Sequence, residues 1–93
     1  QEMTNSQTFN YDKALEVLKE IREYVDFPQF QTTFKENSEN VKAIIEDTIK
    51  AVENKEDVGI VKKSLRILKD LAVGASGSLI ASGIIALLGT LPL

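Results

Sequence analysis

The sequence predicts a small all-α protein, a three- or four-helix bundle that ends in an apolar helix rich in Gly, Ala and Ser. Three observations predict this class. Apolar residues recur at spacings of three and four along most of the chain, the period of an amphipathic helix. No segment shows the two-residue alternation of a half-buried strand. The 93 residues correspond to one domain, whose core is small enough to favour an oligomer.

The first predicted helix covers residues 11–26 and follows a polar segment, residues 1–10, that we expect to be flexible. Asn10 is a good N-cap residue for this helix. Pro28 restricts the backbone of the residue before it and thereby sets the end of the helix. The apolar stripe consists of Tyr11, Ala14, Leu15, Leu18, Ile21 and Val25.

The second predicted helix covers residues 28–53, and Pro28 suits its first turn. The polar run at residues 37–40 is either a kink or the start of a shorter helix capped by Asn37 or Ser38. The three Phe residues between positions 27 and 34 favour a dense core cluster over an exposed docking patch. The inward row is Phe30, Phe34, Val41, Ile44, Ile45, Thr48 and Val52.

Two further helices are predicted at residues 58–73 and 75–89, with Asp57 as the N-cap of the first. They form either one continuous helix or two that divide near Gly74–Gly77, since each interior Gly costs about 0.8–1 kcal/mol relative to Ala. Pro92 is a typical stop signal beyond the last helix. The apolar row is Val58, Val61, Leu65, Leu68 and Ala72, widened by Ile60, Ile67 and Leu71.

The apolar tail, residues 71–93, contains no charged residue and must be buried in protein or in lipid. As one helix, residues 71–89 would rise about 28 Å, against a hydrocarbon core of about 30 Å. The Ser, Gly and Ala content and the absence of Trp favour burial in protein, completed by self-association. A membrane anchor or span and a short surface-active segment are the alternatives. We therefore expect a cytoplasmic protein, with membrane association through the tail as the alternative.

Small residues recur every four positions in this tail, the small-xxx-small pattern of closely packed helices. They predict a seam at which the backbone of a second copy, or of another helical protein, approaches closely. The predicted interaction residues are Gly74, Gly77, Ser78, Ala81, Ser82 and Ala86.

The net charge of −3 is unevenly distributed. The chain carries a net charge of −6 up to Asp57 and of +3 over residues 58–70. The favoured interpretation is a basic helix packed beside acidic ones; the alternative is a basic cluster flanking a membrane segment. Four cations in an acidic chain make a poor phosphate-binding surface, so we expect no nucleic acid partner. The four are Lys62, Lys63, Arg66 and Lys69.

The chain contains neither His nor Cys, which removes the usual general base, the thiol nucleophile and the commonest metal ligands. We expect the tail serines, Ser76, Ser78 and Ser82, to bond back to backbone carbonyls. One helix face gathers four carboxylates, for which a solvated surface is favoured over a cation site. These are Asp12, Glu16, Glu20 and Glu23. We therefore expect no enzyme activity, cofactor, metal or small-molecule substrate.

The run VKKSLRILKDLAVGASGSLIASGIIALLG, residues 61–89, resembles the C-terminal helical module of bacterial abortive-infection and other defence-associated multidomain proteins. The similarity covers about a third of the chain. It lies in residue classes, because no catalytic motif is part of it. The resemblance implies an association or tethering module of bacterial origin.

Three hypotheses of function follow. The first is a non-enzymatic protein–protein interaction and self-association module, with the apolar tail as the seam. The second is a membrane-anchored or membrane-perturbing protein with residues 71–93 in lipid. The third is a small acidic inhibitor or immunity-type protein that docks the carboxylates of its first helix on a basic partner.

Overall fold

A computed structural model describes residues 9–75 and 77–93 and confirms the all-α class. Within these residues there is no strand. The helices are α2 (Tyr11–Glu23), α3 (Pro28–Phe34), α4 (Ser38–Glu53), α5 (Val58–Gly74) and α6 (Leu79–Leu88). Single 3-10 turns, η1 (Tyr24–Asp26) and η2 (Lys35–Asn37), follow α2 and α3.

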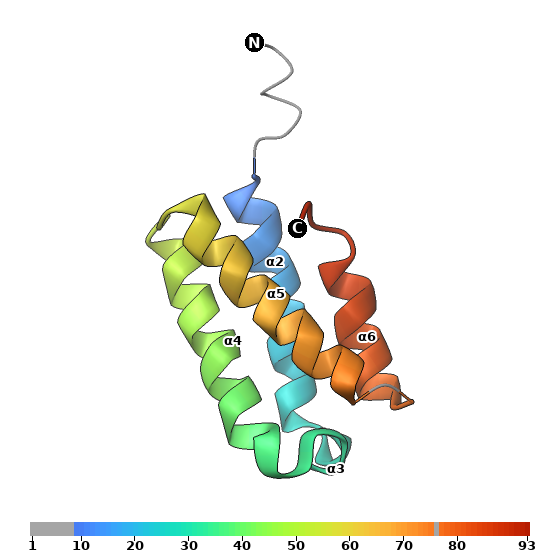
Figure 1. The fold of residues 1–93 in the computed structure, drawn as a ribbon. Coiled ribbons are helices and arrows are strands. Elements are labelled where there is room, and N and C mark those ends of the chain that lie inside the picture. The colour runs from blue at the N-terminus through green and yellow to red at the C-terminus, as the bar shows by residue number, and fades with distance from the viewer. Residues whose placement is uncertain (1–8, 76) are drawn as a thin grey trace.

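Four of these helices pack side by side as a bundle, and the short α3 lies at one end of it (Figure 1). The helix α4 packs against α2 and α5, and α6 packs against the same two helices. The order around the bundle is therefore α2, α4, α5, α6, with α4 and α6 at opposite corners. The core is mainly aliphatic and also buries Phe9, Phe30 and Phe34; its largest fully buried side chains include Phe30, Leu18, Ile21, Ile45, Leu65, Leu68, Ile84 and Leu88.

The predicted start and end of the first helix are confirmed. The Oδ1 atom of Asn10 accepts a hydrogen bond of 3.0 Å from the backbone N–H of Lys13. The helix α2 and the turn η1 together end at Asp26, two residues before Pro28. Of the segment predicted to be flexible, residues 1–8 lie outside the described residues, whereas Phe9 is buried against the core.

The second helix is not continuous over residues 28–53, and the alternative of a shorter helix that starts near residue 38 is confirmed. The predicted cap is wrong, because Asn37 is the N-cap residue but its side chain makes no capping hydrogen bond. Lys35 adopts a positive φ of 50°, which no α-helix can include. The chain therefore leaves the helix after Phe34 and starts again at Ser38, whose hydroxyl donates to the carbonyl of Lys35 at 2.7 Å. This break lets α3 turn under the bundle while Phe30 and Phe34 both remain buried.

The segment after residue 58 forms two helices, α5 and α6, and not one continuous helix. This confirms the predicted alternative of a division near Gly74–Gly77. The Oδ2 atom of Asp57 accepts from the N–H of Gly59 at 2.9 Å and caps α5. Gly77 has a φ of +103°, a conformation that favours glycine. The last helix starts at Leu79, four residues later than predicted, because Ser78 is its N-cap. Among the described residues, no helix has the length and apolar character needed to cross a membrane.

Two predictions about inward-facing residues are wrong. Ile60 and Ile67 leave 54% and 42% of their surface exposed, because α5 buries only a narrow stripe against its neighbours. Phe27 does not join the Phe cluster and is 47% exposed, since it is the residue with extended backbone that connects η1 to α3. The narrow stripe of α5 consists of Val61, Leu65, Leu68 and Ala72.

Candidate functional site

The small residues of the tail do not form one continuous row, because the chain reverses between α5 and α6. Gly74 ends α5 and Gly77 lies in the turn, so neither belongs to α6, which contains Ala81, Ser82 and Ala86 and has Ser78 as its N-cap. Ala81 is fully buried on the inner side of α6. Ser82 and Ala86, one turn apart, are exposed on the outer side, in the row that starts at Ser78. We call this side, with Leu79, the outer face of α6.

Ser78 does not bond back to a carbonyl in the way we predicted for the tail serines. Its hydroxyl oxygen accepts hydrogen bonds from the N–H groups of Ile80 and Ala81 at 3.1 and 3.4 Å. The same oxygen lies 2.7 Å from the hydroxyl oxygen of Thr33 in α3. Ser78 is therefore a cap that also ties the start of α6 to α3. Of the other two serines, Ser82 is exposed and Ser76 lies outside the described residues.

One close contact of the tail involves Gly83, which was absent from the predicted site. A Cβ atom added to Gly83 would overlap the hydroxyl of Tyr24 and would lie 2.8 Å from its Cζ atom. The missing side chain thus makes room for the Tyr24 ring and lets α6 dock on the end of α2. The signal was present in the sequence as a Gly inside an apolar helix, a position that is normally unfavourable.

Two large apolar side chains are exposed at the start of α6 and beside it. Leu79 leaves 91% of its surface exposed, more than any other large apolar residue described, and Phe27 leaves 47%. Between them lies a hollow of about 670 Å³ lined mainly by Tyr24, Phe27, Pro28 and Ile80. The Tyr24 and Phe27 rings meet edge to face at 5.7 Å, which holds Phe27 at the rim of the hollow. An exposed Leu beside an apolar hollow can bind another apolar surface.

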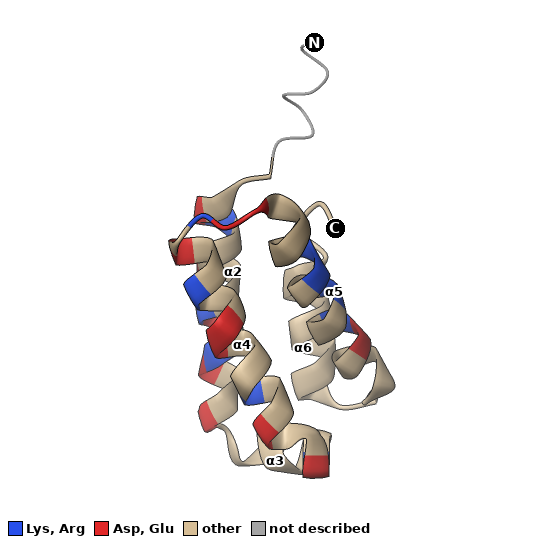
Figure 2. Ribbon diagram, turned by 60° about the vertical axis from the view of Figure 1, so that its left-hand side comes forward, with Lys and Arg blue, Asp and Glu red and all other residues tan. Residues whose placement is uncertain are grey.

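Charge is absent from α6 but present on both of its neighbours (Figure 2). The four carboxylates of α2 are all exposed to solvent; we call Asp12, Glu16, Glu20 and Glu23 the acidic row. On α5, three cations follow one another at intervals of about one helical turn. We call Lys62, Arg66 and Lys69 the basic row.

The cations of α5 form no ion pair within the described part of the chain. The ion pairs there join Arg22 to Glu46 at 3.5 Å and Lys42 to Glu39 at 3.2 Å. The predicted packing of a basic helix beside acidic ones therefore involves no direct pairing across the bundle. Arg66 instead donates a hydrogen bond of 3.3 Å to the carbonyl oxygen of Leu93.

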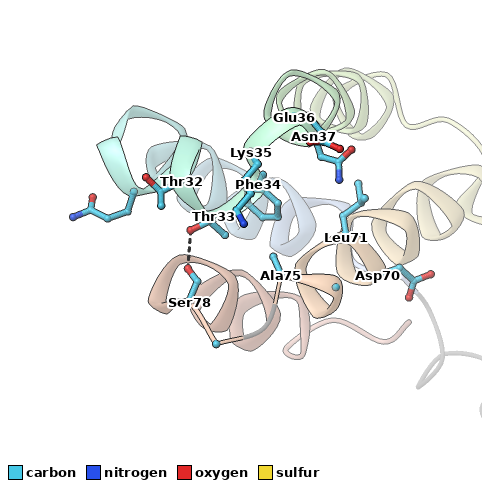
Figure 3. Close-up of a pocket in the computed structure, with 13 residues that line it drawn as sticks. Thr32, Thr33, Phe34, Lys35, Glu36, Asn37, Asp70, Leu71, Ala75 and Ser78 are labelled. Carbon is cyan, nitrogen blue, oxygen red and sulfur yellow. Dashed lines mark hydrogen bonds between the residues drawn. The ribbon is translucent and has the colours of Figure 1, made fainter.

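A polar pocket of about 770 Å³ opens between the α3–η2 segment and the junction of α5 and α6 (Figure 3). Its wall includes the Thr33 and Ser78 hydroxyls, which point toward one another, with Lys35 and Asp70 also on the lining. The carboxylates of Glu36 and Asp70 also line the pocket, and the described residues contain no group of three or more potential metal ligands. The contact observed in the pocket, between Thr33 and Ser78, joins α3 to the start of α6.

Comparison with protein-family models, with curated proteins and with solved structures finds no match to this chain. The assignment of function therefore rests on the surface described above: the outer face of α6, the hollow beside Leu79 and the charged rows on either side.

Proposed function

We propose that this protein is a non-enzymatic self-association module and that copies bind one another through the outer face of α6. The observation that carries the proposal is the 91% exposure of Leu79 at the start of a helix without charged residues. Fully burying a Leu side chain contributes roughly 1.5–3 kcal/mol. A second copy that covers Leu79 and the hollow beside it would gain that free energy.

The remaining residues of this face suit close packing between helices. Ser82 and Ala86 are exposed and small, so the backbone of a partner helix can approach α6 closely along this row. The protein is small enough for burial in an oligomer to add substantially to the stability of its own core. The resemblance of residues 61–89 to defence-associated helical modules also implies association or tethering.

The mass of the purified protein in solution tests this proposal. Light scattering on the full chain, without detergent, should give a discrete small oligomer, and Leu79→Ser should shift the mass toward that of one chain. Ile60→Ser is a matched control, because it removes a similarly large, half-exposed side chain at the far end of α5. A monomeric wild-type protein, or a Leu79→Ser variant of unchanged mass, would contradict the proposal.

One observation favours a second candidate function, association with an anionic membrane surface. The basic row of α5 borders the uncharged α6, an arrangement that suits phospholipid headgroups beside an apolar surface. Sedimentation with vesicles that contain phosphatidylserine tests it. Recovery of the protein with these vesicles but not with neutral ones would support membrane association, and full recovery in the supernatant would exclude it.

A further inference from the structure

The helix α6 lies at the corner where an acidic and a basic surface of the bundle meet. On one side it packs against α2, which carries the acidic row, and on the other against α5, which carries the basic row. The position of each row relative to α6 can be established from contacts with residues of the tail.

On the α2 side, Tyr24 faces α6, since its ring occupies the space beside Gly83. Glu20 is one turn before Tyr24 and Glu16 is one turn earlier, so both lie on the exposed side of α2 next to α6. Lys13 is the cation on this side. Along the helix, Tyr24 is about 6 Å from Glu20, 12 Å from Glu16 and 16 Å from Lys13, whereas α6 extends only about 8 Å beyond Gly83. The charge level with α6 on this side is therefore the acidic Glu20, and Glu16 and Lys13 lie beyond the end of α6.

On the α5 side, Arg66 faces the tail, because its guanidinium donates a hydrogen bond to the backbone carbonyl of Leu93. Lys62 precedes Arg66 by four residues and Lys69 follows it by three, so all three lie on the same side of α5. Asp70, which lines the polar pocket, follows Arg66 by four residues and therefore borders the same row. The surface next to α6 on this side carries three cations and one carboxylate, so its net charge is positive.

The two rows also match in direction and spacing. Both α2 and α5 run antiparallel to α6, as the colours of Figure 1 show. Glu16 and Glu20 are four residues apart, as are Lys62 and Arg66, so each pair spans about 6 Å along its helix. Two copies related by a rotation about an axis parallel to α6 would place these pairs opposite one another in the same order.

We propose that copies of this chain associate head to tail around an axis parallel to α6, with the acidic row of one copy against the basic row of the next. This inference rests on the proposed self-association and names its geometry. The two faces that meet at the corner of a square four-helix bundle lie about 90° apart, so about four copies close a ring. In that ring the uncharged outer faces of α6, with Leu79, lie nearest the axis.

Charge complementarity identifies the occupant as a second copy. A pairing of two α2 faces, or of two α5 faces, would bring each row near a row of the same sign, which is unfavourable. An anionic membrane would attract the basic row and repel the acidic row on the other side of α6. Only a partner with both rows at matching spacing neutralises both, and this chain is such a partner.

Cysteine cross-linking tests the geometry, because the natural chain contains no Cys. The double variant Glu20→Cys/Arg66→Cys should form disulfide-linked oligomers up to the size of the ring on mild oxidation. An equimolar mixture of the two single variants should give covalent dimers, whereas each single variant alone should stay uncross-linked. Self-cross-linking of either single variant would overturn the head-to-tail arrangement. So would the absence of cross-links in a double variant that light scattering shows to be oligomeric. A monomeric wild-type protein would instead refute the self-association itself.

Charge reversal supplies an independent test. Glu16→Lys/Glu20→Lys and Lys62→Glu/Arg66→Glu should each have the mass of a single chain, and their equimolar mixture should recover the mass of the wild-type oligomer. Recovery on mixing also shows that both variants are folded. The control Asp47→Lys/Glu53→Lys makes the same charge change on exposed positions of α4 and should keep the wild-type mass. An oligomer that persists in either reversed variant alone would contradict the proposal.

Discussion

The helices α4 and α6 occupy opposite corners of the bundle and contact the same two neighbours, yet their outer surfaces differ. The outer side of α4 carries acidic and basic residues along its 16-residue length. The outer side of α6 carries only uncharged residues, among them Leu79, Ser82 and Ala86. Both helices bury an apolar side against the same neighbours, so packing inside the bundle does not require this difference. The charged surface of α4 suits solvent, and the uncharged surface of α6 suits the second copy that the proposed self-association requires.

The largest loss of stability should come from the core that both corners share. Leu65→Ala removes a fully buried side chain from α5, which packs against both α4 and α6, and should cost about 2–5 kcal/mol. Urea unfolding followed by circular dichroism measures the cost. Ile60→Ala, at an exposed position of the same helix, should stay within about 0.5 kcal/mol of wild type. Equal losses in the two variants would mean that the stripe is misassigned.

A smaller loss should follow at the inner side of α6. Gly83→Ala improves helix propensity but forces a Cβ atom into the Tyr24 ring, so we expect a net destabilisation of about 1–3 kcal/mol. Gly74→Ala is the control, because no atom lies within 4 Å of its added Cβ, and it should stabilise by about 0.5–1 kcal/mol. Thermal unfolding of the two variants should therefore shift in opposite directions. A stabilised Gly83→Ala variant would show that Tyr24 moves aside easily.

The junction of α5 and α6 should contribute less again. Ser78→Ala removes the side-chain cap of α6 and the partner of Thr33, at an expected cost of about 1 kcal/mol. Ser78→Asp keeps a cap acceptor and should recover part of the loss. Chemical denaturation measures both. A Ser78→Ala variant with wild-type stability would show that the cap does not stabilise the junction.

The smallest effect on folding, and a large one on assembly, should come from the outer face of α6. Ala86→Arg places a charge on an exposed position, so it should change the free energy of unfolding of the single chain by less than about 0.5 kcal/mol. The same charge would have to be buried in the proposed oligomer, so light scattering should report a single chain. Ala43→Arg, at an exposed position of α4, is the matched control and should leave the mass unchanged.

The sequence predicts local features of this fold well, because the signals for them are local. Asn10 and Asp57 cap the helices that they were expected to cap. Pro28 marks a helix start, and the interruptions near residues 37 and 75 are real. Each of these depends on the chemistry of a few neighbouring residues along the chain.

Features that depend on contacts between distant segments were harder to predict. Periodicity identifies Ile60 and Ile67 as apolar but does not show how much of α5 its neighbours cover. The prediction of one row of small residues starting at Gly74 required a single continuous helix. In the structure the chain reverses before Leu79, at Gly77 with its positive φ and at the Ser78 cap. The fit of Gly83 to Tyr24 joins positions 59 residues apart and has no local signature beyond the glycine itself.

The contact between Thr33 and Ser78 has a consequence for the dynamics of the protein. It joins segments 45 residues apart in the chain, at the point where α6 begins. Detachment of α6 from the bundle must break this contact, so α3 and α6 should open as one cooperative unit. Hydrogen exchange at the backbone amides would then show similar opening free energies for α3 and α6. A Thr33→Val variant should reduce the protection of amides in the first turn of α6 more than that of amides in α4.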